Sequence, residues 1–289
     1  MAMPKDTYYL TAHCPGNLGT VDVVTRYLRE QGCYVVEMQT FDDVLSRHFF
    51  IRAEFRPPAG QPFDEAAFGN GFAPRADGFN MQWQLTASHY RPNVVVMVSR
   101  LDHCLNDLLY RYRTGQLAME IPAIISNHPD LQRLADWHHI PYYHLPVDDD
   151  NREQQEAQVL GIIKECDADL VVLARYMQML SPALSAELNG WAINIHHSLL
   201  PGFKGANSYH QAYDKGVKLV GATAHYINND LDEGPIITQG VEVVDHSHYP
   251  EQLIAKGKDI ECITLSRAVQ YHIEQRVFLH NGKTVVFTS

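Results

Sequence analysis

Residues 191–239 read WAINIHHSLLPGFKGANSYHQAYDKGVKLVGATAHYINNDLDEGPIITQ. The stretch holds two apolar runs, at 192–195 and 219–227, and each has the length and character of a buried strand. Leu-Pro-Gly interrupts the chain after the first run, and the second run leads into a turn at 231–235 that is rich in carboxylates and breakers. We therefore expect two strands whose margins carry polar side chains.

Three kinds of polar group stand at these margins. Asn194 and His196 are two positions apart, so alternation along a strand places both side chains on the same face. His225 lies in the second run, and Asp232 lies in the turn after it. Singly, a histidine beside a strand and an aspartate in a turn are more often structural. Together, an amide, an imidazole and a carboxylate are costly to bury without purpose, and they can stabilise an oxyanion and move a proton.

Two segments of the sequence resemble a known protein family. NIHHSLLP at 194–201 and GATAHYINNDLDEGPIITQ at 221–239 resemble the formyl-transfer domain of folate-dependent formyltransferases and hydrolases. With its flanking segments the resemblance covers most of residues 93–289, and the N-terminal part fits one branch of the family, the formyltetrahydrofolate deformylases. The match places the family's three catalytic residues at Asn194, His196 and Asp232.

Composition and motifs exclude several functions. The net charge of −11 argues against a nucleic acid partner, because phosphate backbones require lysine and arginine. Five scattered cysteines indicate reduced thiols in a cytoplasmic protein. The sequence has no HExxH-type ligand spacing, and Asp-His-Ser-His at 245–248 is typical of a polar turn. It also has no apolar span long enough for a membrane helix. We therefore expect no metal, no cofactor beside the folate substrate, and no membrane.

Residues 7–87 predict a small separate domain. Strand and helix patterns alternate in the order β-α-β-β-α-β, which is typical of a ferredoxin-like α+β fold. This order, with a glycine-containing loop after the first strand, resembles an ACT domain. The resemblance implies a glycine or methionine effector and pairing into a homodimer or homotetramer. Because the first loop has Gly16–Asn17 where relatives often carry an acidic residue, a dimerisation module without a ligand is an equal alternative.

After a linker at 88–93, residues 94–289 predict the catalytic domain. Continuous apolar strands such as 94–98 and 170–174 alternate with helical patterns. This alternation is typical of an α/β fold with a Rossmann-like, mostly parallel sheet that is covered on both faces. Ligands of such sheets bind beyond the carboxyl ends of the strands, and Asn194 and His196 are expected there.

The turn after the first of these strands, at 99–107, lacks a phosphate cradle. Such a turn binds phosphate through glycines and a helix N-terminus, whereas SRLDHCLND has no glycine and has two carboxylates, one of them offset by Arg100. By resemblance, glycinamide ribonucleotide formyltransferases carry a Gly- and Ser-rich loop here. A nucleotide acceptor is therefore poorly provided for, which favours water as the acceptor.

The segment LARYMQML at 173–180 resembles the family's pterin loop. The resemblance implies backbone contacts to a folate from Gln178 and Leu180, and apolar walls from Met177 and Met179. From composition alone, ordinary core filling is the alternative for these apolar side chains.

The resemblance implies hydrolysis of 10-formyltetrahydrofolate to formate and tetrahydrofolate. Asn194 and His196 would donate to the oxyanion, while Asp232 would orient water and transfer its proton. We expect burial, or the neighbours Asp230 and Glu233, to raise the pKa of Asp232. Two histidines would support the site: His225 by holding Asp232, and His197 as a departure from the proline of transferase relatives.

Two other functions stay open at this point. One is a folate-dependent formyltransferase that acts on an amine, and the other is a catalytically silent folate or amino-acid sensor. The acidic charge and the absent phosphate loop disfavour the first, and the complete Asn194, His196 and Asp232 set disfavours the second. The family resemblance also implies roles in supplying formate for purine biosynthesis and in balancing the one-carbon pool.

Overall fold

The computed structural model describes residues 7–60, 62–148, 150–202 and 208–288, so residues 203–207 of the quoted stretch lie outside it. The chain forms two compact units. The first comprises the residues up to Tyr90 together with Glu274–Phe278 and the residues from Val285 onward. The second comprises Arg91–Ile273 and Leu279–Thr284.

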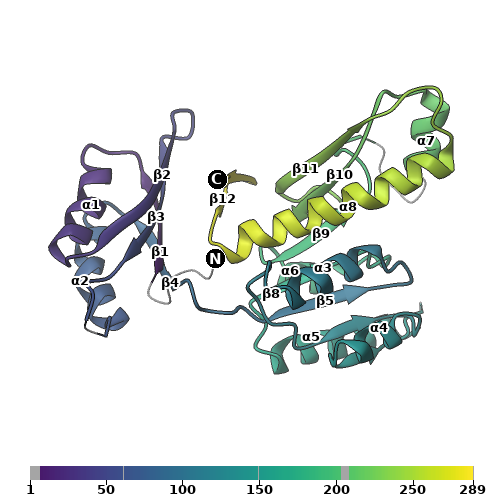
Figure 1. Ribbon diagram of the computed structural model, residues 1–289, viewed down its shortest axis with the longest axis horizontal. Helices are drawn as coiled ribbons and strands as arrows, with labels where there is room; N and C mark the ends of the chain where they lie inside the picture. Colours follow the sequence, from purple (N-terminus) through teal and green to yellow (C-terminus); the bar gives the residue numbers. More distant parts are fainter. Residues whose placement is uncertain (1–6, 61, 149, 203–207, 289) are drawn as a thin grey trace. The chain divides into compact units, whose positions relative to one another are not determined.

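The first unit is the predicted ferredoxin-like α+β fold. Its four-stranded antiparallel sheet has the order β2-β3-β1-β4, and both helices lie on the same face of the sheet (Figure 1). Its elements, in chain order, are β1 (Tyr8–Pro15), α1 (Thr20–Glu30), β2 (Tyr34–Asp43), β3 (His48–Arg56), α2 (Glu65–Asp77) and β4 (Gln82–Ala87).

Alternation along the strands explains how this unit is filled. Leu10, Ala53 and Phe55 point to the helical face and pack with Val24 and Phe72 in a buried cluster. The opposite face carries a second cluster, in which Phe50 packs against Phe278 and Phe287 of the C-terminal segments.

The second unit is built on a seven-stranded sheet of order β11-β10-β9-β8-β5-β6-β7. Its strands are β5 (Val94–Val98), β6 (Ile124–Ser126), β7 (Tyr142–His144), β8 (Leu170–Leu173), β9 (Ala192–His196), β10 (Leu219–Tyr226) and β11 (Ile236–Val243). The neighbouring strands β9, β8, β5, β6 and β7 run parallel to one another. Strand β10 is antiparallel to β9, and β11 is antiparallel to β10. The predicted Rossmann-like, mostly parallel sheet is thus confirmed.

Helices cover both faces of this sheet. They are α3 (His103–Arg113), α4 (Gln132–Trp137), α5 (Arg152–Glu165), α6 (Pro182–Glu187), α7 (Ser208–Lys215) and α8 (Pro250–Ile273). Helices α4 and α5 lie on one face, and α3 and the long α8 lie on the other (Figure 1). Every residue of β5 is buried between them, which explains why that strand is apolar throughout instead of alternating. A short hairpin, β12 (Val277–His280) and β13 (Lys283–Val286), follows α8.

Two elements go beyond the sequence prediction. The sequence pattern does not predict α7, because polar residues outnumber apolar ones there. The pattern predicts only the end of β11, since Gly240 and polar residues interrupt the apolar run of this edge strand. Among the described residues, no helix has the length and apolar character that a membrane crossing requires.

Gly221 on β10 tests the packing that holds β10 in place. An added Cβ there would lie 2.2 Å from the Gly240 carbonyl oxygen and 2.6 Å from the Leu199 side chain. We expect Gly221→Ala to lower the free energy of unfolding by about 1–3 kcal/mol, because the Gly240 backbone cannot move aside. The urea unfolding midpoint measures this loss.

Gly161 in the interior of α5 provides the matched control. An added Cβ there meets nothing within 4 Å, so Gly161→Ala should raise stability by about 0.5–1 kcal/mol through helix propensity. Equal midpoints for the two variants would contradict the close approach at Gly221.

Candidate active site

The site is built on the antiparallel ladder between β9 and β10. This ladder sets Asn194 opposite His225 and Thr223 opposite His196. Directly opposed residues point to the same face, so one face of two strands presents an amide and two imidazoles. The Asn194 amide donates a hydrogen bond to His225 Nε2 over 3.3 Å.

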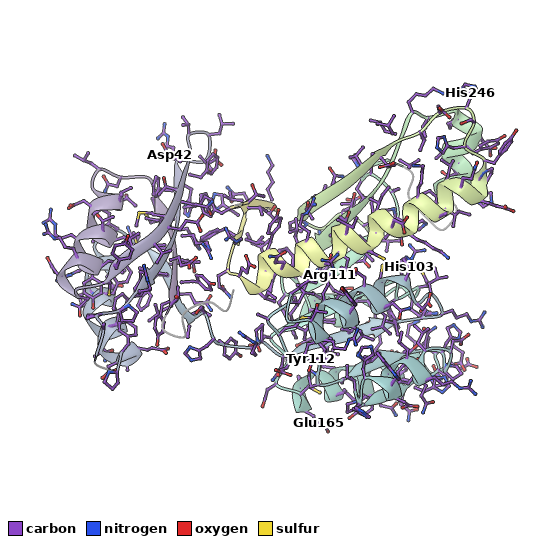
Figure 2. All side chains as sticks on the ribbon, viewed as in Figure 1. Asp42, His103, Arg111, Tyr112, Glu165 and His246 are labelled. Carbon is purple, nitrogen blue, oxygen red and sulfur yellow. The ribbon has the colours of Figure 1, made fainter. Side chains whose placement is uncertain are left out.

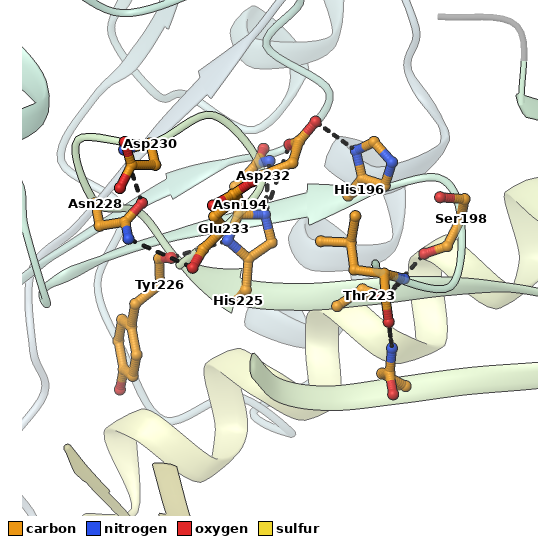
Figure 3. Close-up of polar contacts among 12 residues, drawn as sticks. Asn194, His196, Ser198, Thr223, His225, Tyr226, Asn228, Asp230, Asp232 and Glu233 are labelled. Atoms are coloured by element: carbon orange, nitrogen blue, oxygen red, sulfur yellow. Dashed lines mark hydrogen bonds and ion pairs between the residues drawn. The ribbon is translucent and has the colours of Figure 1, made fainter. Parts of the chain in front are cut away.

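The loop after β10 returns Asp232 to this face. Asp232 Oδ2 lies 3.2 Å from His196 Nδ1, and Oδ1 lies 3.8 Å from His225 Nε2. The loop folds back tightly, because a Cβ on Gly234 would lie 1.7 Å from the Tyr226 carbonyl oxygen. Asp232 itself has a left-handed backbone, with φ of 56°. The predicted residues Asn194, His196, Asp232 and His225 therefore converge, as Figure 3 shows.

His225 is held as a neutral ring. Its Nδ1–H donates to the Tyr226 carbonyl over 2.8 Å, which leaves Nε2 as the acceptor for the Asn194 amide. Burial lowers the pKa of His225, and the nearby positive charge of His196 acts in the same direction. The hydrogen bond to Tyr226 and the charge of Asp232 oppose this shift without reversing it.

The expectation of a raised Asp232 pKa was wrong. Burial does raise the pKa of this carboxyl, but the hydrogen bond and charge of His196, with smaller contributions from His225 and His197, lower it below its usual value. The sequence prediction counted the neighbouring acidic residues and could not count three histidines from other strands and turns. Asp232 is therefore an ionised carboxylate at neutral pH.

A cavity of about 440 Å³ opens onto these residues. The predicted folate-binding residues Met177, Gln178, Met179 and Leu180 all line it, together with Asn194, His196, His197, His225 and Asp232. Met177 and Met179 are 48% and 64% exposed, so core filling does not explain them. Only Leu180 also packs against the buried cluster below the sheet.

The cavity wall contains an unsatisfied polar atom. His196 is 5% exposed, and its Nε2 has no hydrogen-bond partner among the described residues. In the imidazolium form, His196 donates from Nδ1 to Asp232 and offers Nε2–H to the cavity. His197 is also buried, and its ring lies 5.1 Å from that of His196.

Sequence reasoning assigned no role to Arg175, which also lines the cavity. Arg175 follows β8, is 8% exposed and has a φ of 66°. A charged residue directly after a continuous apolar run was the available signal, but no sequence pattern identified its partner. That partner is Glu261 of α8, whose Oε2 lies 3.4 Å from Arg175 Nε.

Among the described residues, one group has metal-like spacing: His103, Cys104 and Glu261 place their ligand-type atoms within 4.8 Å of one another. The Arg175 guanidinium beside the Glu261 carboxylate opposes a cation there. Cys104 is not poised as a thiolate ligand either, because a hydrogen bond with Cys262 and burial raise its pKa.

Comparison with known proteins places the chain among folate enzymes. The formyl transferase family model matches residues 92–269. The chain is 46% identical over 279 residues to the formyltetrahydrofolate deformylase of Corynebacterium sp. (strain P-1), covering 96% of this chain and 97% of that protein. It is 41% identical over 284 residues to the formyltetrahydrofolate deformylase of Bacillus subtilis (strain 168), covering 98% and 94%. The crystal structure of a formyltetrahydrofolate deformylase from Pseudomonas putida KT2440 matches with a TM-score of 0.92 and 67% identity, covering 98% of this chain and 100% of that one.

The histidine environment can be measured by ring ¹⁵N NMR. We expect His225 to titrate below the ordinary value near 6.5 and to carry its proton on Nδ1 when neutral, with the signal assigned by its loss in His225→Gln. Asp232→Asn should lower the midpoint further, because the Asp232 charge raises the pKa of His225.

The same shift sets a pH dependence of stability. A histidine whose pKa is lower in the folded chain binds fewer protons than in the unfolded chain, so its contribution to stability falls as pH drops below about 6.5. In the NMR titration of His225, a proton on Nε2 of the neutral ring, or a titration midpoint above 6.5, would contradict the hydrogen bond to Tyr226 and the lowered pKa.

Proposed function

The chain belongs to the formyltetrahydrofolate deformylase family, and from this membership we propose that its cavity binds 10-formyltetrahydrofolate and hydrolyses it to formate and tetrahydrofolate. One observation carries the proposal: Asn194, His196 and Asp232 meet on the wall of the same cavity that Met177–Leu180 line. An oxyanion site and a general base thus face a pocket with an apolar rim.

The reaction needs water to be aimed and charge to be held. The water oxygen attacks the formyl carbon, and the carbonyl becomes an oxyanion. The bond from carbon to N10 then breaks, one proton reaches N10, and the formic acid released ionises to formate. A formamide resists this attack because nitrogen donation stabilises its carbonyl, so the protein must stabilise the tetrahedral state.

The proposed roles follow from the contacts. His196 Nε2 is buried without a partner in the described chain, so an oxyanion in the cavity would supply its missing acceptor. The Asn194 amide points to the same face and keeps one N–H beyond the bond to His225. Asp232, an ionised carboxylate, would accept the water proton and pass it toward N10.

Supporting residues hold these groups. His225 accepts from Asn194, which orients the amide, and its ring lies 3.8 Å from the Asp232 carboxylate. His197 forms the wall behind His196. For the folate, we propose apolar contacts from Met177 and Met179 and backbone contacts from Gln178 and Leu180. No separate cofactor or metal is part of this mechanism.

The alternatives are less well supported. A transferase to an amine needs a place for the acceptor, and a silent sensor has no need for three converging catalytic groups. We propose that the hydrolase acts in the cytoplasm, supplies formate for purine biosynthesis and balances the one-carbon pool.

The domain roles are proposals as well. We assign residues 7–87 to a regulatory or oligomerisation domain, 88–93 to a linker and 94–289 to catalysis. Homodimers or homotetramers would form through the first domain, and glycine or methionine would be its effector. The ferredoxin-like order of this unit supports an ACT-like role.

Formate release without an added amine tests the reaction. We expect the wild-type protein to give formate and tetrahydrofolate in equal amounts, and Asp232→Asn to lose roughly 100-fold or more in rate while still binding folate. The loss follows because the amide cannot take the water proton.

Glu233→Gln is the matched control, since Glu233 is an exposed carboxylate in the same loop and should keep normal turnover. Near-normal turnover in Asp232→Asn would remove Asp232 from the mechanism, and no formate from the wild type would refute the hydrolase.

The effector proposal has its own measurement. Calorimetric titration of glycine and methionine into the full chain should give saturable heat with one of them, and that amino acid should change the rate of formate release. An absence of heat with both would leave an oligomerisation module without a ligand.

A further inference from the structure

A buried cluster of charged and polar side chains lies behind one wall of the cavity. Glu261 of α8, 1% exposed, is its centre. Its Oε2 lies 2.7 Å from His103 Nε2 and 3.4 Å from Arg175 Nε, and its Oε1 accepts a hydrogen bond from the Tyr209 hydroxyl over 3.0 Å. We call His103, Arg175, Tyr209 and Glu261 the Glu261 cluster. Burial raises the pKa of Glu261, but the hydrogen bond and charge of His103, the charge of Arg175 and the hydrogen bond from Tyr209 together lower it below its usual value, so the carboxylate is ionised.

The cluster lies at the place where an open α/β sheet normally binds its ligand. The strand order reverses between β5 and β8, and ligands bind at the carboxyl ends of the strands on either side of such a point. His103, labelled in Figure 2, begins α3, which follows β5. Arg175 follows β8. The two turns touch, because the Met177 N–H donates to Ser99 Oγ over 2.9 Å.

A carboxylate from a distant helix lies beside the N-terminus of α3. Residues 103–106, its first turn, include no acidic side chain, and the Asp102 side chain does not cap the helix. The N-terminus of a helix carries partial positive charge and binds anions such as phosphate. The Glu261 carboxylate lies within 4.8 Å of the His103 and Cys104 side-chain ligand atoms of this turn.

We propose that Glu261 determines the acceptor specificity of the enzyme by acting as an internal anion. Its carboxylate takes the position that the phosphate of an amine acceptor would occupy, which closes this side of the cavity to such acceptors and leaves water. The inference rests on the proposed hydrolase function. Arg175 couples the two regions, because its side chain lines the cavity and contacts Glu261.

Charge and geometry both support this assignment. With Glu261 in place, an incoming phosphate would meet a buried negative charge whose partners, His103 and Arg175, are already engaged. Without it, His103, Arg175 and the α3 N-terminus would lose the anion that lies between them. Arg175 Nε has no hydrogen-bond partner in the described chain and lies 3.4 Å from Glu261 Oε2, so a phosphate in place of the carboxylate could accept the hydrogen bond that Glu261 leaves unmade.

The local packing is adapted to hold the carboxylate. Gly257 lies one helical turn before Glu261 on α8, and a Cβ on Gly257 would lie 2.1 Å from the Tyr209 hydroxyl. The absence of a side chain at Gly257 therefore makes room for the ring that donates to Glu261.

Inorganic phosphate is the probe for the test. We expect Glu261→Ala to melt at a lower temperature than the wild type, and phosphate at about 100 times its dissociation constant to raise that melting temperature by roughly 5 °C or more. The wild type and Glu251→Ala, which removes an exposed carboxylate of the same helix, should not respond beyond a chloride control of equal ionic strength.

Two results would overturn the proposal. One is a Glu261→Ala protein that gains no more stability from phosphate than Glu251→Ala does. The other is competitive inhibition of wild-type formate release by phosphate, which would show an open anion site and needs no folded variant. Phosphate binding is measured independently of turnover, so a wild type that releases no formate refutes the hydrolase function and leaves the anion-binding result intact.

Discussion

The ladder between β9 and β10 sets Asn194 against His225 and leaves His196 beside the returning loop. Strand β10 runs antiparallel to β9, and the loop that joins β10 to β11 brings Asp232 back to His196 of β9. Asp232 depends on that return. The strained backbone at Asp232 and the tight approach at Gly234 are the local costs of placing a carboxylate within 3.2 Å of His196.

Two carboxylates of the second unit, the partly buried Asp232 and the buried Glu261, are each paired with groups from other elements. Asp232 faces the cavity, paired with His196, and Glu261 lies behind the wall, paired with His103 and Arg175. Burial alone would raise the pKa of each carboxyl, and in both cases cationic or histidine partners lower it. The proposed mechanism uses the first charge to move a proton, and the proposed specificity uses the second to keep other anions away.

Periodicity predicted most of the secondary structure because the buried strands are continuous apolar runs and the helices carry apolar stripes. The α7 helix escaped prediction, since its mixed polar sequence gains stability from packing against α8 and not from its own pattern. Sequence motifs identified the candidate residues Asn194, His196, His225 and Asp232. That these side chains lie together follows from the register between β9 and β10, which the sequence does not show. The Asp232 pKa was predicted in the wrong direction, because its neighbours in sequence are acidic and its neighbours in space are histidines.

The amino-acid sequence established the order of elements, the two fold types, the family resemblance and the residue types of the catalytic set, because each of these depends on local pattern or on a motif. Only the tertiary structure determined which charged and polar side chains contact one another. Glu261 lies far along the sequence from both Arg175 and His103, yet it is in contact with each of them. Long-range pairing of this kind leaves no periodic trace in a single sequence, because it depends on the strand order and on the packing of α8 against α3 and β10.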